Sequence, residues 1–385
     1  MKINKSKSII SENDDEDNLE FFFRTITSLQ AITIILIIIW HIGDLSSIRF
    51  SPNIFIRTFF EIIESSGDVF IFLSGMLLAF WVTRNNKDRS WKKWYGRRVV
   101  RIYPLLIISV PLYLVSNYFL FSEIYSINSI LIHMSGLQSI PTNPNFFLIA
   151  PPHWYITLLL SCYLLFPLLY FLIKKNIKLV AFGGLLLYIC YLLFANNIYE
   201  LSKNLVNLVF QKELILWYFS LFILRYFVFF FGMLLGFWLG KDTTRKINFL
   251  QKKSVGLIAF LTLMLIVLCY FIFPITDTTF LDFIRILYHP IITINIVIFS
   301  IWFFKNRRKT NKVLEVPGNA TLELFLFHQL IVDNIYYRII VRFSLQDRIE
   351  LYLLFIPLIV IISVALSFPF YLLGNFFKKE KKLHK

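Results

Sequence analysis

The sequence predicts an all-α protein: a polytopic membrane helix bundle with about ten transmembrane helices. Of its 385 residues, 57% are hydrophobic and only 16% are charged, whereas soluble domains average about 45–50% and about 25%. The apolar residues come in blocks of roughly 18–25, which is long enough for a helix to cross ~30 Å of hydrocarbon. Almost the whole chain, residues 25–377, is therefore expected to form one membrane domain.

Ten blocks have the length and composition of a membrane span. Two further blocks, near 124–138 and 205–219, are ambiguous, and each is interpreted as a short interfacial or re-entrant helix. The ten predicted spans cover roughly 26–44, 63–83, 99–121, 152–173, 178–196, 216–239, 255–274, 282–304, 320–341 and 351–376.

Basic residues alternate with these blocks. They cluster after the second, fourth, sixth and eighth blocks and in the C-terminal tail, whereas the stretch 121–150 has no Lys or Arg. Cytoplasmic loops carry the excess of Lys and Arg, so we expect a multi-pass protein of the cell membrane with both termini cytoplasmic. Residues 1–24 are predicted to be a disordered acidic tail and residues 378–385 a basic tail.

The same charge distribution limits the partners. The net charge of +16 lies in short loops between apolar blocks, so membrane lipids are the expected surroundings and nucleic acid is not expected to bind. The three cysteines lie within apolar blocks and lack metal-ligand spacing. No metal site is therefore predicted.

The run WKKWYGRRVVRIYP, residues 91–104, places cations directly before and inside the third block. A guanidinium at the edge of hydrocarbon is costly unless it reaches the interface or is paired. Its planar fork also suits phosphate. The run is therefore either a topology anchor or an anion site on the inner membrane face.

Two ionisable residues are predicted at the outer end of the first two blocks. His41 ends the first block, about 25 Å from Arg24 along a helix; it is either a general base or an interfacial histidine beside Trp40. Asp68 opens the second block. It is either a helix cap or a group that orients His41.

Other polar residues mark later blocks. Trp154 opens the fourth block and suits an interfacial aromatic belt, and His153 beside it is a candidate for lining the outer cavity. Arg225, Glu323 and His328 lie within or near the ends of the sixth and ninth blocks. Arg225 and Glu323 are a candidate ion pair.

In this order and spacing, the motifs resemble the acyltransferase-3 family of integral membrane acyltransferases over essentially the whole chain. The first span resembles that of the family, which ends in a functional histidine, here His41. The RxxR motif of the third span is matched by Arg98 and Arg101. The matching segments are FFRTITSLQAITIILIIIWH, GDVFIFLSGMLL, RRVVRIYP, HWYITLLLSCYLLFP, RYFVFFFGMLLG and TLELFLFHQLIV.

The resemblance implies transfer of an acyl group, usually acetyl, from cytoplasmic acyl-CoA to a hydroxyl of a cell-surface polysaccharide or its lipid-linked precursor. His41 is then the base, Asp68 orients it, and Arg98 and Arg101 bind the donor. The residues expected to bind substrate are His153, Trp154, Arg225, Glu323 and His328.

Two alternatives stay open at this point. A flippase or exporter of lipid-linked sugars would use buried charges as a substrate or proton path, and an envelope scaffold would use them structurally. The chain also departs from the family at two positions. Gln30 stands where an arginine is common, and Leu159 stands where some members have a glutamate. Neither residue can neutralise a charge.

Overall fold

The computed structural model describes residues 3–45, 53–85, 90–138, 149–210, 214–272, 278–306, 312–342 and 349–383. It is 93% helical and has no strand within these ranges, which confirms the predicted all-α class. The α-helices are α1 (Ile3–Leu45), α2 (Ile54–Glu64), α3 (Ser66–Asn85), α4 (Trp91–Phe121), α5 (Ile127–Ser135), α6 (Trp154–Lys175), α7 (Ile177–Phe210), α8 (Leu214–Lys241), α9 (Thr243–Leu250), α10 (Lys253–Ile272), α11 (Thr278–Phe303), α12 (Lys312–Asn319), α13 (Thr321–Ile335) and α14 (Ile349–Leu383). Short 3₁₀ segments cover Pro151–His153 and Phe304–Asn306, and a π-helical segment covers Tyr336–Val341.

All ten predicted spans fall on helices, but the count of about ten is not confirmed. Within the described ranges, seven helical segments are long and apolar enough to cross a membrane, or eight if α9 and α10, which meet at a bend of 57°, form one span. The described apolar part of α11 is shorter, His289–Phe303. Helix α13 has 15 residues before the backbone becomes π-helical.

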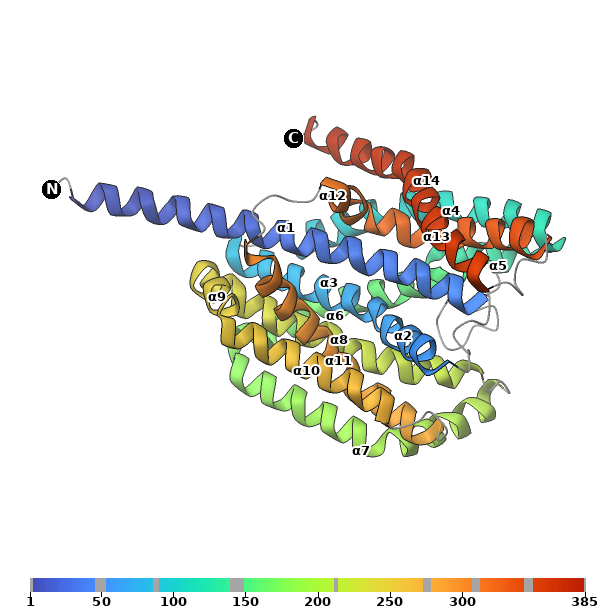
Figure 1. Cartoon of the computed structure of the whole chain (residues 1–385), viewed down its shortest axis with the longest axis horizontal. Coiled ribbons are helices and arrows are strands. Elements are labelled where there is room, and N and C mark those ends of the chain that lie inside the picture. The colour runs from blue at the N-terminus through green and yellow to red at the C-terminus, as the bar shows by residue number, and fades with distance from the viewer. Residues whose placement is uncertain are drawn as a thin grey trace.

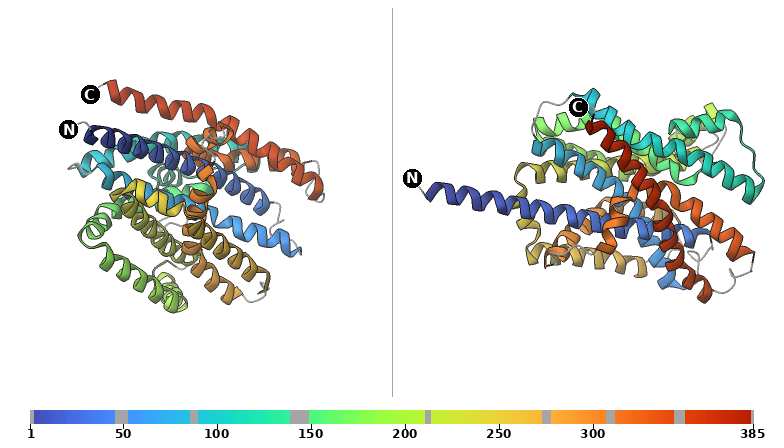
Figure 2. Two further views of the ribbon diagram at one scale, coloured as in Figure 1. Left: turned by 60° about the vertical axis from the view of Figure 1, so that its left-hand side comes forward. Right: turned by 90° about the horizontal axis from the view of Figure 1, so that it is seen from above.

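Successive long helices run in opposite directions (Figure 1). The end of one helix and the start of the next therefore lie at the same end of the bundle, and the two ends of the bundle differ in charge. One end, here called the basic end, carries Arg84 at the end of α3, Lys174 at the end of α6 and Lys241 at the end of α8. Both chain termini lie toward this end, as Figure 2 also shows. The opposite, far end holds the end of α1 and the starts of α3 and α6.

The assignment of the basic end to the cytoplasm stays a prediction, as does the division into two tails and one membrane domain. Helix α1 begins at Ile3. It therefore includes most of the segment that was expected to be a disordered tail.

Helices α3 and α8 run parallel in backbone contact along a glycine stripe. A Cβ at Gly232 would collide with the carbonyl of Phe72, and one at Gly236 would collide with the carbonyl of Met76. Gly75 on α3 approaches α8 in the same way. Small residues spaced by four let membrane helices approach this closely, and the contact fixes the register between α3 and α8.

The close contact along this stripe leads to a prediction about stability. Gly236→Ala is expected to destabilise the protein by about 1–3 kcal/mol, because the methyl group has to push two backbones apart. A lower midpoint of thermal unfolding in detergent would show it. Gly183→Ala is the matched control, because a Cβ at Gly183 has no atom within 4 Å. An equal midpoint for the two variants would contradict the close contact.

Candidate functional site

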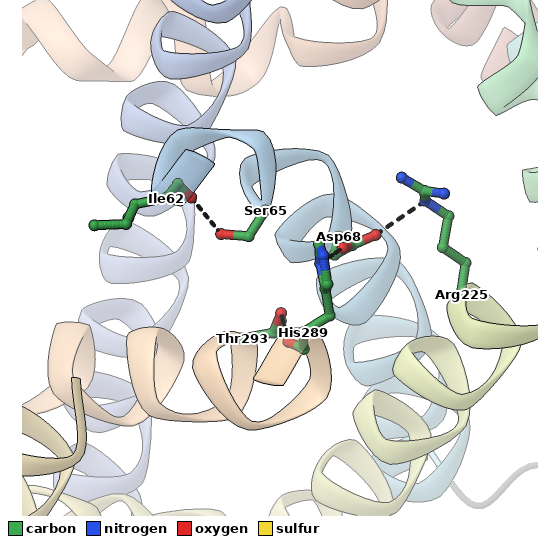
Figure 3. Close-up of polar contacts among 6 residues, drawn as sticks. All are labelled: Ile62, Ser65, Asp68, Arg225, His289 and Thr293. Atoms are coloured by element: carbon green, nitrogen blue, oxygen red, sulfur yellow. Dashed lines mark hydrogen bonds and ion pairs between the residues drawn. The ribbon is translucent and has the colours of Figure 1, made fainter. Parts of the chain in front are cut away.

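A buried cluster of three ionisable side chains lies toward the far end. Asp68, in the first turn of α3, is 1% exposed. Its Oδ1 forms an ion pair with Nε of Arg225 on α8 at 3.0 Å, and its Oδ2 accepts a hydrogen bond from Nδ1 of His289 on α11. Figure 3 shows the two partners approaching the carboxylate from different helices.

Local chain features place two members of the cluster, Asp68 and His289. The turn at Ser65 separates α2 from α3, and the Asp68 amide donates to the Ser65 carbonyl at 3.0 Å. On α11, Pro290 removes a backbone donor next to His289. The Thr293 hydroxyl donates to the His289 carbonyl at 2.6 Å, which satisfies that acceptor within the helix.

The cluster changes two expectations. The expected pair of Arg225 with Glu323 is wrong: Arg225 takes Asp68 as its carboxylate partner, because the glycine stripe holds α3 and α8 together. The orientation of His41 by Asp68 stays a prediction, since the carboxylate is shared here by Arg225 and His289.

His289 was not among the residues expected from the sequence. The available signal was a histidine inside an apolar block, YHP at 288–290, because ionisable groups within membrane spans are functional candidates by default.

His41 lies in the last turns of α1 and meets α13 through a second histidine. The ring centroids of His41 and His328 are 4.9 Å apart. His328 is fully buried, and its Nδ1 lies 3.0 Å from the Leu324 carbonyl and 2.9 Å from the Phe325 carbonyl. A nitrogen facing carbonyl oxygens is assigned as the protonated one, so Nε2 of His328 is the basic nitrogen.

His153 belongs to a separate group. Its Nε2 lies 3.1 Å from Oγ of Ser109 on α4, and its ring centroid is 5.4 Å from that of Tyr113. His133 on α5 lies beyond it, at a centroid distance of 6.5 Å. Burial lowers the pKa of His133, because desolvation disfavours the imidazolium. This is a group of polar side chains.

The neighbouring Trp154 joins the Asp68 cluster instead. The Arg225 guanidinium carbon lies 4.7 Å from the centroid of the Trp154 ring, within the range of a cation–π contact. Two of the five expected substrate-binding residues, Trp154 and Arg225, are therefore brought together. Glu323 is buried in the first turn of α13.

The two arginines of the RxxR motif lie toward the basic end, on α4. The Arg98 guanidinium carbon is 5.2 Å from the Trp94 ring and 5.6 Å from the Tyr163 ring, so α4 and α6 hold it between them. Arg101, one turn further on, is exposed.

An aromatic row extends from α6 to the histidine pair. The Tyr155 and Phe325 ring centroids are 4.4 Å apart, and those of Phe325 and His328 are 5.7 Å apart. The row therefore leads from Tyr155 to His328 and on to His41. His328 and His41 were expected from the sequence, whereas Tyr155 and Phe325 were not.

Comparison with known proteins places the chain at the level of the family. A family model described as an acyltransferase domain matches residues 23–372, nearly the whole chain. No match was found among curated proteins or among solved structures. The match confirms the resemblance drawn from the motifs and favours an enzyme over a flippase or a scaffold. The apolar helices and the matched domain together show that the chain is a membrane acyltransferase and belongs to the acyltransferase-3 family.

Proposed function

We propose that the enzyme moves an acyl group, in the first instance acetyl, from cytoplasmic acyl-CoA to a hydroxyl of a cell-surface polysaccharide or its lipid-linked precursor. The observation that carries this proposal is the separation of two kinds of site along one bundle. Arg98 and Arg101 lie toward the basic end of α4, whereas His41 lies near the far end of α1. Both helices run in the same direction (Figure 1).

This separation suits a donor and an acceptor that come from opposite sides. Acyl-CoA carries several phosphate charges, and arginine binds phosphate through its planar fork. A nucleotide held at the basic end leaves its long pantetheine arm to reach inward along the row formed by Tyr155 and Phe325. The acceptor hydroxyl then meets the thioester beside the His41–His328 pair, whose ring centroids are 4.9 Å apart.

The chemistry needs one proton acceptor and one leaving thiolate. His41 removes the proton from the acceptor hydroxyl as its oxygen attacks the thioester carbon. A C–O bond forms, the C–S bond breaks, and the proton passes to the departing thiolate to give CoA. His328 belongs to the same pair, and its basic Nε2 shares the proton with His41.

The direct test is transfer of radiolabel from acetyl-CoA to envelope glycan by purified protein in lipid nanodiscs. Mass spectrometry of glycans from a deletion strain should show loss of an acyl increment, and its mass identifies the acyl group. If neither the transfer nor the mass increment depends on the protein, the proposed donor and acceptor are wrong.

The donor site has its own expected result. Arg98→Ala should weaken CoA binding about tenfold or more, because charge-assisted hydrogen bonds are worth ~1.5–3 kcal/mol. Calorimetric titration with CoA measures this, and the KM for the acceptor should stay unchanged. Lys92→Ala is the control, since Lys92 is an exposed cation in the first turn of the same helix. Equal CoA affinity in both variants would contradict the donor role of Arg98.

A further inference from the structure

Within the described part of the chain, Arg225 is anchored to a carboxylate through Nε alone, and its two terminal nitrogens have no acceptor. Only its Nε faces Asp68, at 3.0 Å, and its side chain is 11% exposed. Figure 3 shows the two terminal nitrogens pointing away from the carboxylate. Among the residues that the structure describes, the other contact of Arg225 is the face of the Trp154 ring. Because this contact is made with the face of the ring, the N–H groups at the edge of the guanidinium stay available to an acceptor.

His289 explains why Asp68 does not take the whole fork. Carboxylates commonly bind arginine through two parallel hydrogen bonds, one from each oxygen. Here Oδ2 of Asp68 accepts from Nδ1 of His289, so only Oδ1 is left for Arg225. Each oxygen of Asp68 therefore faces a different partner, and the carboxylate does not take up the two terminal nitrogens of Arg225.

A largely buried cation with unused donors favours a ligand that supplies both a charge and paired acceptors. Unmet donors in a buried place cost free energy. The terminal nitrogens of a guanidinium match two oxygens of a phosphate or carboxylate in one plane. Trp154 and the ion pair with Asp68 hold this plane in place before any ligand arrives, which lowers the ordering cost of binding.

We propose that the terminal nitrogens of Arg225 bind an oxoanion group of the acceptor, and that His289 is the positioning residue that keeps this fork open by occupying the second oxygen of Asp68. The inference rests on the proposed function, since it assigns the charge class of the acceptor. Two acceptor groups share this chemistry, the diphosphate of a lipid-linked sugar and the carboxylate of an acidic sugar. A neutral glycan does not have it.

The test is anion binding by the full-length protein in nanodiscs, with saturating CoA so that the donor site is occupied. The probes are inorganic pyrophosphate, glucuronate and neutral glucose, and the readout is the midpoint of thermal unfolding, which a ligand of the folded state raises. We expect pyrophosphate or glucuronate, and not glucose, to raise the midpoint. The oxoanion that raises the midpoint also shows which acceptor group the terminal nitrogens of Arg225 bind.

Variants assign the effect to the fork. Arg225→Lys keeps the charge but not the planar pair of donors, so the oxoanion should bind at least about tenfold more weakly. Arg84→Lys is the matched control, because Arg84 lies on α3, the helix packed against α8, but at the basic end, where its Nη1 donates to the Thr243 hydroxyl at 3.0 Å. It should bind the oxoanion as the unaltered protein does.

His289 supplies an independent variant. His289→Leu frees Oδ2 of Asp68 to chelate Arg225, so oxoanion binding should weaken, whereas His289→Gln keeps a donor and should restore it. CoA affinity should not change in any of these variants, which separates this proposal from the donor site. Oxoanion binding that is unchanged in Arg225→Lys, or absent from the unaltered protein while acyl transfer is intact, would overturn the inference and leave the proposed function standing.

Discussion

His41→Ala is expected to reduce acyl transfer by about 10²–10⁴-fold, the usual contribution of a positioned general base. CoA binding should persist, because the cations proposed to hold the donor lie toward the other end of the bundle, on α4. The rate of transfer from radiolabelled acetyl-CoA, compared with the affinity for CoA by calorimetry, separates the two effects. The loss should appear in kcat, with little change in the KM for the donor.

A control and a pH profile sharpen this result. His384→Ala also removes one histidine, at a position outside the described residues, and should retain full transfer. The unaltered enzyme should lose kcat as the pH falls through the pKa of its base, because a protonated imidazole cannot accept the hydroxyl proton. The residual activity of His41→Ala should lack this limb. Full transfer by His41→Ala would refute its role as the base.

Asp68→Leu is expected to destabilise the protein by about 3–5 kcal/mol, as removal of one partner from a buried ion pair does. Asp68 is 1% exposed and the Arg225 side chain is 11% exposed. The variant leaves a largely buried guanidinium without its counter-ion and an imidazole without its acceptor. Denaturation in detergent, followed by circular dichroism, measures the loss.

The double variant Asp68→Leu with Arg225→Leu is to be compared with the single variant Asp68→Leu. Replacing both members of a buried pair by apolar residues is often neutral or stabilising, so the double variant should recover much of the lost stability. It should nevertheless lack oxoanion binding, because the fork is gone. If both substitutions together cost as much as the sum of the two single ones, the two side chains do not interact.

Much of the fold follows from the sequence, because whether a membrane helix forms depends mainly on the residues of its own segment. Each predicted span falls on a helix, since a run of about 20 apolar residues satisfies its own backbone hydrogen bonds in any surroundings. The break at Ser65 between α2 and α3 and the change to a π-helix after Ile335 were not predicted. Composition alone does not mark them, and both interrupt the α-helix within a predicted span.

The site could be predicted only in part, for a different reason. His41, Asp68 and Arg225 were visible as ionisable residues within apolar blocks, but their partners depend on the register between helices far apart in the chain. Asp68 and His289 are 221 positions apart, and the pair exists because α11 packs beside α3. The expected partner of Arg225, Glu323, lies in the first turn of α13, whose main neighbours are α14, α1 and α4.

The glycine stripe between α3 and α8 also bears on motion. Two helices in backbone contact cannot slide past each other by less than about one turn, ~5.4 Å, without collision. Asp68 and Arg225 are therefore carried on a single rigid body. Any rearrangement that admits an acceptor is therefore expected to move Asp68 and Arg225 together, with their spacing unchanged. The geometry of the proposed acceptor site is thus set by the same glycines that fix the register between α3 and α8.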